Sequence, residues 1–227
     1  MKLLKDNPIS PNKASEWYSI SIILLLFLTS FGYNYLFPRQ IPINIYIQSE
    51  VVYYLPAWLF SFLLPFIALF IYIFLLNLPK NNKSNTLFTK FSKLYHLLKD
   101  AIISILALIY FFSSLAILGY DINTSFWLPI FISLLFLIIG IMLNKFRLNY
   151  FLGFKTIWSL KSKEIRDSVN HLGGKLFIFV AFLIALLSFL PKNLHFIVFL
   201  LIIIILFIVP FFYSYYLHIK KIRNKKL

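Results

Sequence analysis

Long apolar runs without charge alternate with short polar segments along the whole chain. Six runs approach or exceed the roughly 20 residues that a helix needs to cross the hydrocarbon core of a bilayer. Runs such as residues 200–209 show no alternation of apolar and polar positions, so a membrane β-barrel is excluded. Backbone groups in lipid must then be satisfied within helices. The predicted spans are residues 17–37, 55–78, 101–120, 122–143, 172–190 and 194–217.

The composition agrees with this pattern. Of the 227 residues, 61% are hydrophobic and only 13% are charged, whereas a soluble domain carries about 25% charged residues. So few charged side chains cannot cover a water-facing surface, and most of the exterior must therefore face lipid. The sequence predicts an all-α polytopic membrane protein with six transmembrane helices.

The basic residues predict the orientation of these helices. Lys and Arg accumulate on the cytoplasmic side of membrane proteins, and 20 of the 22 here lie in the two terminal tails or within residues 79–100 and 144–175. Only Arg39 and Lys192 fall on the other side. Both termini are therefore predicted to be cytoplasmic, in a multi-pass protein of the cell membrane. The net charge of +15 then reflects topology and contact with anionic lipid, not direct binding of nucleic acid.

The spans fall into two predicted units. Residues 1–98 hold the first two spans, an outer loop at 38–56 and a cytoplasmic loop at 79–100. Residues 99–227 hold the other four spans and a polar loop at 144–175, which carries three of the six glycines. The outer loop contains the sequence IPINIYIQ, whose alternation is typical of an extended strand.

A short interfacial helix is predicted between the fourth and fifth spans. Within residues 163–172, Ile165 and Val169 share one helical face with Leu172. Such an amphipathic helix is expected to lie at the level of the lipid headgroups. The Gly-Gly pair that follows is expected to end it and to turn the chain into the fifth span.

Catalytic chemistry is not indicated. The chain has no cysteine, so disulfides and thiolate metal sites are excluded. Its four histidines fall at separate helix ends or loops, and its seven acidic residues form no pair inside a predicted span. Metal sites need clustered ligands, and coupled transport commonly uses carboxylates inside the membrane. The sequence therefore predicts no catalytic residue, no metal and no cofactor, and it favours a protein that is not an enzyme.

One polar stretch, NYFLGFKTIWSL at 149–160, carries a more specific pattern. It resembles the cytoplasmic signature of the SdpI family of bacterial membrane proteins, roughly N-x-x-x-G-x-R-T-x-x-[ST]-L followed by Trp, His and Gly before the fifth span. Lys155 replaces the Arg of that pattern, Arg166 its Trp and Asn170 its His. The candidate binding residues of this loop are Asn149, Gly153, Lys155, Thr156, Ser159, Leu160 and Gly174.

The first third of the chain extends the resemblance. The sequence FPRQIPIN at 37–44 looks like the L-P-x-x-I-P-x-H loop of a domain of unknown function that often precedes the SdpI segment. Asn44 replaces the final His of that loop. The candidate contacts of the outer loop are Pro38, Pro42 and Asn44.

The resemblance implies an immunity protein, which protects the producing cell from a secreted, membrane-active peptide toxin. The type member of the family also signals, because it holds a cytoplasmic repressor at the membrane when toxin is present. Lys155 lacks the planar guanidinium that binds carboxylate or phosphate through two hydrogen bonds, so repressor capture is a separate hypothesis from resistance. The implied partners are membrane lipids, a peptide toxin and a cytoplasmic transcriptional repressor.

Two other functions stay open. Pro65 and Pro129 interrupt the hydrogen bonding of the second and fourth spans, which would suit a small transporter or lipid-handling protein with a central cavity. Lys155, Thr156 and Ser159 could grip a lipid phosphate in an enzyme, yet no base or metal ligand stands beside them in the sequence. A polar cavity between the spans would favour transport, and a solid bundle would disfavour it.

Overall fold

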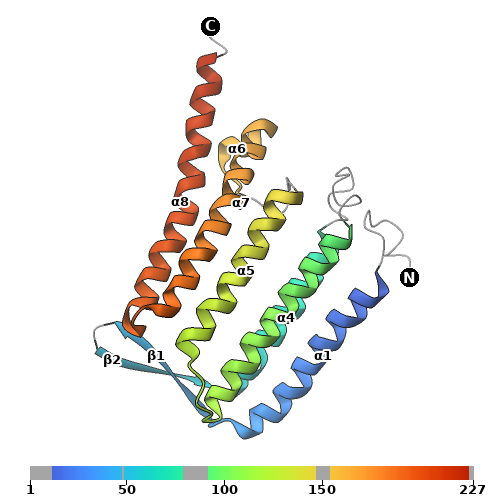
Figure 1. Ribbon diagram of the computed structural model, residues 1–227, viewed down its shortest axis with the longest axis vertical. Helices are drawn as coiled ribbons and strands as arrows, with labels where there is room; N and C mark the ends of the chain where they lie inside the picture. The colour runs from blue at the N-terminus through green and yellow to red at the C-terminus, as the bar shows by residue number, and fades with distance from the viewer. Residues whose placement is uncertain (1–11, 48, 79–91, 147–153, 225–227) are drawn as a thin grey trace.

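The computed structural model describes residues 12–47, 49–78, 92–146 and 154–224. Within them, six helices are long and apolar enough to cross a membrane. In Figure 1, α1, α4, α5, α7 and α8 follow one another across the bundle, and α2 lies behind α4, where it packs against both α1 and α4. The predicted polytopic all-α fold with six spans is confirmed. The long helices are α1 Lys13–Leu36, α2 Ala57–Asn77, α4 Ser92–Ile117, α5 Thr124–Phe146, α7 Lys163–Leu186 and α8 Lys192–Asn224.

The helices extend beyond several of the predicted spans. Helix α1 begins at Lys13 and α4 at Ser92, whereas their predicted spans begin at residues 17 and 101. Those predicted boundaries lay beside charged residues, because a charge is costly inside a bilayer. The charged residues at these helix ends instead belong to the helices, where they contact one another across α1 and α4.

Two hydrophobic cores hold the long helices together. The larger core joins α1, α2, α4 and α5 and includes Leu26, Ala68 and Ile103. The smaller core joins α7 and α8 around Ile184 and Leu206, next to a short 3-10 helix, η3 Leu187–Phe189. Helix α5 packs against both α4 and α7 and so connects the two halves. The division into units 1–98 and 99–227 stays a prediction.

A hydroxyl at the centre of the larger core connects three helices. Ser30 of α1 is fully buried, and its Oγ lies 2.8 Å from the backbone oxygen of Ser61 in α2 and 2.9 Å from the Tyr110 hydroxyl in α4. Small side chains let helix backbones approach closely in lipid, and polar groups there find partners across helices. The bundle is therefore positioned by polar contacts as well as by apolar packing.

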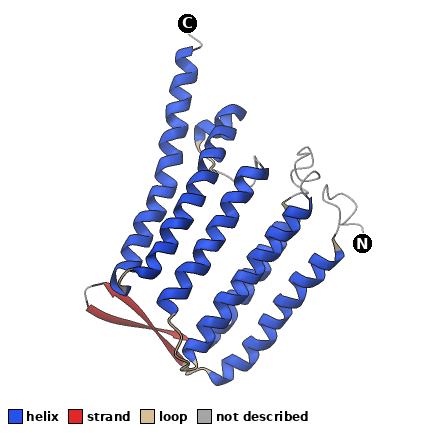
Figure 2. Cartoon of the chain, in the orientation of Figure 1, coloured by secondary structure: helices blue, strands red, loops and turns tan. Residues whose placement is uncertain are grey.

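The outer loop folds into a β-hairpin. Strands β1 Gln40–Ile47 and β2 Ser49–Pro56 pair antiparallel, with Gln40 opposite Pro56. The predicted extended segment is confirmed as β1, and β2 occupies the second half of the predicted outer loop, where no strand was predicted. Figure 2 shows the hairpin at the end of the bundle opposite to both termini.

The polar loop before the fifth span differs from the prediction. Helix α7 runs without a break from Lys163 to Leu186, so the expected separate helix at 163–172 is the first part of the span itself. Gly173 and Gly174 lie buried inside α7 and do not end a helix. A different short helix, α6 Ile157–Lys161, precedes it.

Candidate functional site

The loop that carries the signature folds into a short capped turn of helix. Thr156 is the N-cap of α6, and its Oγ1 accepts a hydrogen bond from the Ser159 backbone N–H at 3.1 Å. The Ser159 hydroxyl accepts in return from the Thr156 N–H at 2.8 Å. This reciprocal pairing is a capping box, which satisfies backbone donors that would otherwise lack partners at a helix start. The T-x-x-S spacing of the motif therefore has a local structural cause.

The same loop is fastened to α8. The Thr156 hydroxyl hydrogen-bonds to that of Ser214, which is fully buried in α8. The Trp158 ring packs against Phe211 and Tyr215, with ring centroids 5.3 Å and 5.1 Å away. Further along α8, Lys221 bonds to the first turns that follow α6: its Nζ donates to Ser162 Oγ and to Glu164 Oε2. The loop is thus one structural unit with the end of α8.

The other side of this loop packs where α5 and α7 meet. The Asn170 side-chain oxygen accepts a hydrogen bond from the Phe154 backbone N–H at 3.0 Å. A Cβ added to Gly173 would lie 2.3 Å from the Phe154 ring, and one added to Gly174 would lie 2.7 Å from the Asn144 side chain. Both glycines are therefore required by close packing, not by a turn.

The candidate binding residues consequently separate into two groups. Thr156 and Ser159 are buried, with exposed fractions of 8% and 0%, and Gly174 is buried as well. Lys155 and Leu160 are exposed. The buried group shapes the loop, and the exposed group, joined by Ile157 at 66% exposure, forms the accessible surface of the loop. The two remaining candidates, Asn149 and Gly153, lie outside the described residues.

The outer-loop candidates lie at the opposite end of the molecule (Figure 1). Pro38 is exposed just before β1. Pro42 and Asn44 lie within β1, opposite Tyr54 and Val52 in the hairpin register. The protein therefore carries two candidate sites, one at each end of the helix bundle.

A third polar site was missed by the sequence analysis. Glu16 of α1 accepts a hydrogen bond from Lys99 of α4 at 2.8 Å, and Lys99 is only 1% exposed. Asp100 lies 3.7 Å from the same ammonium group and accepts a hydrogen bond from the Ser19 hydroxyl at 2.7 Å. The Tyr72 hydroxyl of α2 donates to the second Glu16 oxygen at 2.7 Å. We call Glu16, Lys99 and Asp100 the charge cluster.

This cluster corrects the expectation that the spans are free of charge. Each of the three residues stands just before an apolar run, so each was read as a loop residue. A signal was available in the sequence, because extending the first and third helices by one or two turns brings an acidic residue into each. Which charges meet could not be read from the sequence, since Glu16 and Lys99 are 83 residues apart.

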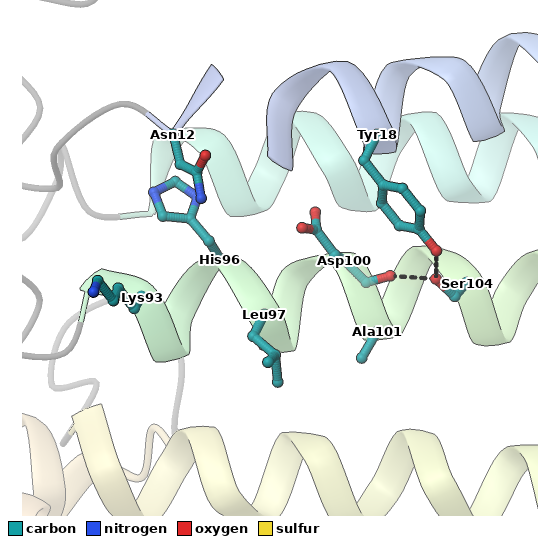
Figure 3. Close-up of a pocket in the computed structure, with 8 residues that line it drawn as sticks. All are labelled: Asn12, Tyr18, Lys93, His96, Leu97, Asp100, Ala101 and Ser104. Atoms are coloured by element: carbon teal, nitrogen blue, oxygen red, sulfur yellow. Dashed lines mark hydrogen bonds between the residues drawn. The ribbon is translucent and has the colours of Figure 1, made fainter. Parts of the chain in front are cut away.

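A cleft opens beside the charge cluster, between the first turns of α1 and of α4. Its volume is about 600 Å³. Figure 3 shows Tyr18 and Asn12 on the α1 side of the cleft and the other lining residues on α4, with the Tyr18 hydroxyl hydrogen-bonded to Ser104 at 2.8 Å. We call this the α1–α4 cleft. Its lining residues are Asn12, Tyr18, Lys93, His96, Leu97, Asp100, Ala101 and Ser104.

Metal chemistry has no visible basis in this part of the chain. Across residues 12–47, 49–78, 92–146 and 154–224, no group of three or more His, Asp or Glu side chains is placed to hold a metal ion. The polar sites are built from hydroxyls, amides and one buried ion-pair cluster. Their arrangement defines a class: a polytopic helical membrane protein with polar sites at both ends of its helix bundle.

Part of the chain matches a known protein family. Residues 145–214, which contain the signature loop, α7 and most of α8, match the SdpI/YfhL protein family. Over 211 residues the chain is 24% identical to the immunity protein SdpI of Bacillus subtilis (strain 168), covering 92% of this chain and 97% of that protein. The resemblance to the SdpI family is thereby confirmed. No solved structure matches the chain significantly.

Proposed function

We propose that this protein is an immunity protein of the bacterial cell membrane, which protects the cell from a secreted, membrane-active peptide toxin. The observation that carries the proposal is the match to the immunity protein SdpI, which extends over nearly the whole of both chains. A match of that extent includes all six spans and the hairpin as well as the signature loop. It therefore supports a shared function of the whole molecule more than a shared fragment.

The hairpin is the proposed contact for the toxin. It lies at the end of the bundle away from the termini (Figure 2), and the distribution of Lys and Arg predicts that this end faces outward. A secreted peptide reaches that end first. Pro38, Pro42 and Asn44 are the proposed contact residues there.

The signature loop is proposed to act inside the cell without catalysis. The Thr156 and Ser159 hydroxyls are engaged in the capping box and in the contact with Ser214. Engaged hydroxyls do not support the phosphate-gripping enzyme considered above. The exposed residues of the loop, Lys155 and Leu160, are instead the proposed contacts for a cytoplasmic partner such as a transcriptional repressor.

A small transporter or lipid-handling protein is the second candidate. The α1–α4 cleft favours it, because a cleft with charged residues in its wall lies between two of the long apolar helices. The cleft lies between the first turns of α1 and α4, however, at one end of the bundle, whereas transport requires a path through the membrane. The immunity function is therefore preferred.

The test is expression of the full chain in a sensitive bacterial host that is challenged with the peptide toxin encoded at the same locus. Survival should rise above that of the vector control. Lys155→Ala and Asn149→Ala are expected to abolish protection while the membrane level of the protein stays unchanged, and Lys220→Ala, an exposed lysine of α8, serves as the matched control. Full protection by both site variants would show that the loop is only a connection, and no protection by the unaltered chain would exclude the proposed function.

A further inference from the structure

The α1–α4 cleft has walls of mixed charge. Lys93 is exposed near the start of α4, and Asp100 stands two helical turns further along the same helix. Side chains on a helix lean toward its N-terminus, so the Asp100 carboxylate extends back toward the turn that carries His96 and Lys93. A cationic group and an anionic group therefore line one cleft in succession (Figure 3).

The charge cluster behind the cleft brings two carboxylates to one ammonium group. Glu16 and Asp100 are both within 4 Å of the single Lys99 ammonium group, at 2.8 Å and 3.7 Å. Two carboxylates therefore share the buried Lys99 ammonium group, and the His96 ring, which lines the cleft, lies 3.7 Å from the same Glu16 oxygen that Lys99 contacts. Of the two carboxylates, Asp100 lines the cleft. The Asp100 carboxylate already accepts a hydrogen bond from Ser19 and lies 3.7 Å from Lys99, and a cation in the cleft would add a charge-assisted hydrogen bond to it.

The cleft also has an apolar side that faces lipid. Leu97 is 63% exposed, and Ala101 lies one turn further along α4. The cleft runs from Lys93 to Ser104, which is about 16 Å along a helix that rises 1.5 Å per residue. Since the headgroup layer of one leaflet is only about 5–8 Å thick, the cleft reaches from the headgroups to the first part of the acyl chains.

We propose that the α1–α4 cleft binds a phospholipid whose headgroup carries both a phosphate and a primary ammonium, as in phosphatidylethanolamine. The phosphate binds at Lys93, and the ammonium donates hydrogen bonds to the Asp100 carboxylate. The first part of an acyl chain packs on Leu97 and Ala101. Charge-assisted hydrogen bonds are about twice as strong as neutral ones, so both poles of the headgroup contribute.

This assignment distinguishes between the common bilayer lipids. A trimethylated ammonium, as in phosphatidylcholine, has no N–H to donate to Asp100. Phosphatidylglycerol offers the same phosphate to Lys93 but has no ammonium group to place beside Asp100. The inference does not depend on the proposed immunity function, because it rests only on the cleft and the charge cluster.

The experiment measures lipid binding to the purified, delipidated full chain by native mass spectrometry and by titration in detergent. Phosphatidylethanolamine is expected to bind about tenfold or more tightly than phosphatidylcholine or phosphatidylglycerol. Asp100→Asn should remove the preference over phosphatidylcholine, and Lys93→Gln should weaken binding of all three lipids. Asp121→Asn, an exposed aspartate in the loop after α4, is the matched control and should change nothing.

A second variant keeps the test decisive if Asp100→Asn destabilises the protein. Ala101→Phe fills the apolar side of the cleft without altering any charge, and it should reduce binding of phosphatidylethanolamine about tenfold. Soluble phosphoethanolamine should bind far more weakly than the lipid, because it lacks the acyl chain. Equal binding of the three lipids, a preference for phosphatidylglycerol, or unchanged binding by the Ala101 variant would each overturn the proposal.

Discussion

Gly140 and Gly32 both lie inside long helices, but only the packed structure shows how different their surroundings are. Gly140 of α5 faces α7 so closely that an added Cβ would lie 2.9 Å from the Gly174 backbone oxygen and 3.0 Å from the Ile178 backbone nitrogen. Backbone atoms of a packed helix cannot rotate away as a side chain can. Gly32 of α1, by contrast, has nothing within 4 Å of an added Cβ.

Substituting these two glycines should therefore have opposite effects. Gly140→Ala is expected to destabilise the protein by about 1–3 kcal/mol, because it overpacks the interface between α5 and α7. Gly32→Ala should be neutral or stabilise it by up to about 1 kcal/mol, because alanine favours a helix more than glycine does. Thermal unfolding in detergent measures both. A Gly140 variant that melts with the wild type would show that α5 and α7 are not in such close contact.

The stability of the protein should also fall when one member of the charge cluster is removed. Lys99 is buried and contacts two carboxylates, and removal of one partner of a buried ion pair costs about 3–5 kcal/mol because the other charge is left uncompensated. Lys99→Met is therefore expected to lower the melting temperature or the folded yield sharply. Lys175→Met, an exposed lysine of α7, is its control and should stay within about 0.5 kcal/mol of the wild type.

A double substitution tests whether loss of the Glu16–Lys99 ion pair is the cause of this destabilisation. In the double variant Glu16→Gln, Lys99→Met, one of the two uncompensated carboxylates is gone, so the loss should be smaller than the sum of the two single losses. Additive losses would mean that Glu16 and Lys99 do not form the pair that the structure shows.

At the scale of elements, the hairpin is a separable part of the fold. The Ala57 N–H donates to the Arg39 backbone oxygen at 3.1 Å, so the chain enters and leaves the hairpin at adjacent points. Ile41, at the base of β1, packs with Phe37 and Ala57 in a small core of its own. The base of the hairpin therefore belongs to the bundle, and β1 also contacts α8.

This geometry allows the outer part to be removed alone. Replacing residues 43–53 by Asn-Gly should close the strands with a two-residue turn after the pair Pro42 and Tyr54, because this dipeptide favours the tight turns of hairpins. The shortened protein is expected to reach the membrane and to melt near the wild-type temperature, but to lose protection against the toxin. Unchanged survival of challenged cells at equal membrane level would remove the hairpin from the proposed contact surface.

For the molecule as a whole, orientation is the property on which both proposed contact surfaces depend. The signature loop and both termini lie at one end of the helix bundle, and the hairpin and the loop between α4 and α5 lie at the other (Figure 1). The natural chain has no cysteine, so a single introduced thiol reports its own location without background.

Labelling of single-cysteine variants should place the two ends on opposite sides of the membrane. Asp121→Cys is expected to react with a membrane-impermeant maleimide in intact cells. Lys163→Cys, at the exposed start of α7, should react only after the membrane is permeabilised. Rapid labelling of the Lys163 variant in intact cells would reverse the orientation and with it the proposed roles of the hairpin and the signature loop.

The sequence by itself determined the number and type of the spans, the extended character of β1 and the resemblance of the signature loop. These properties depend on local composition, because the free energy of placing a segment in lipid is close to a sum over its own residues. The same reasoning misplaced the starts of α1 and α4 and ended a helix at the Gly-Gly pair. In both cases a local rule was overridden by a contact with a distant segment.

Only the tertiary structure decided which polar groups meet. Lys99 can lie inside the bundle because Glu16, 83 residues away, compensates its charge. Thr156 and Ser159 serve the shape of the loop because Ser214 of α8 lies beside them. Such pairings depend on how helices pack against each other, and neither composition nor periodicity records that. The α1–α4 cleft is another such pairing, because 55 residues of chain separate the two helices that form it.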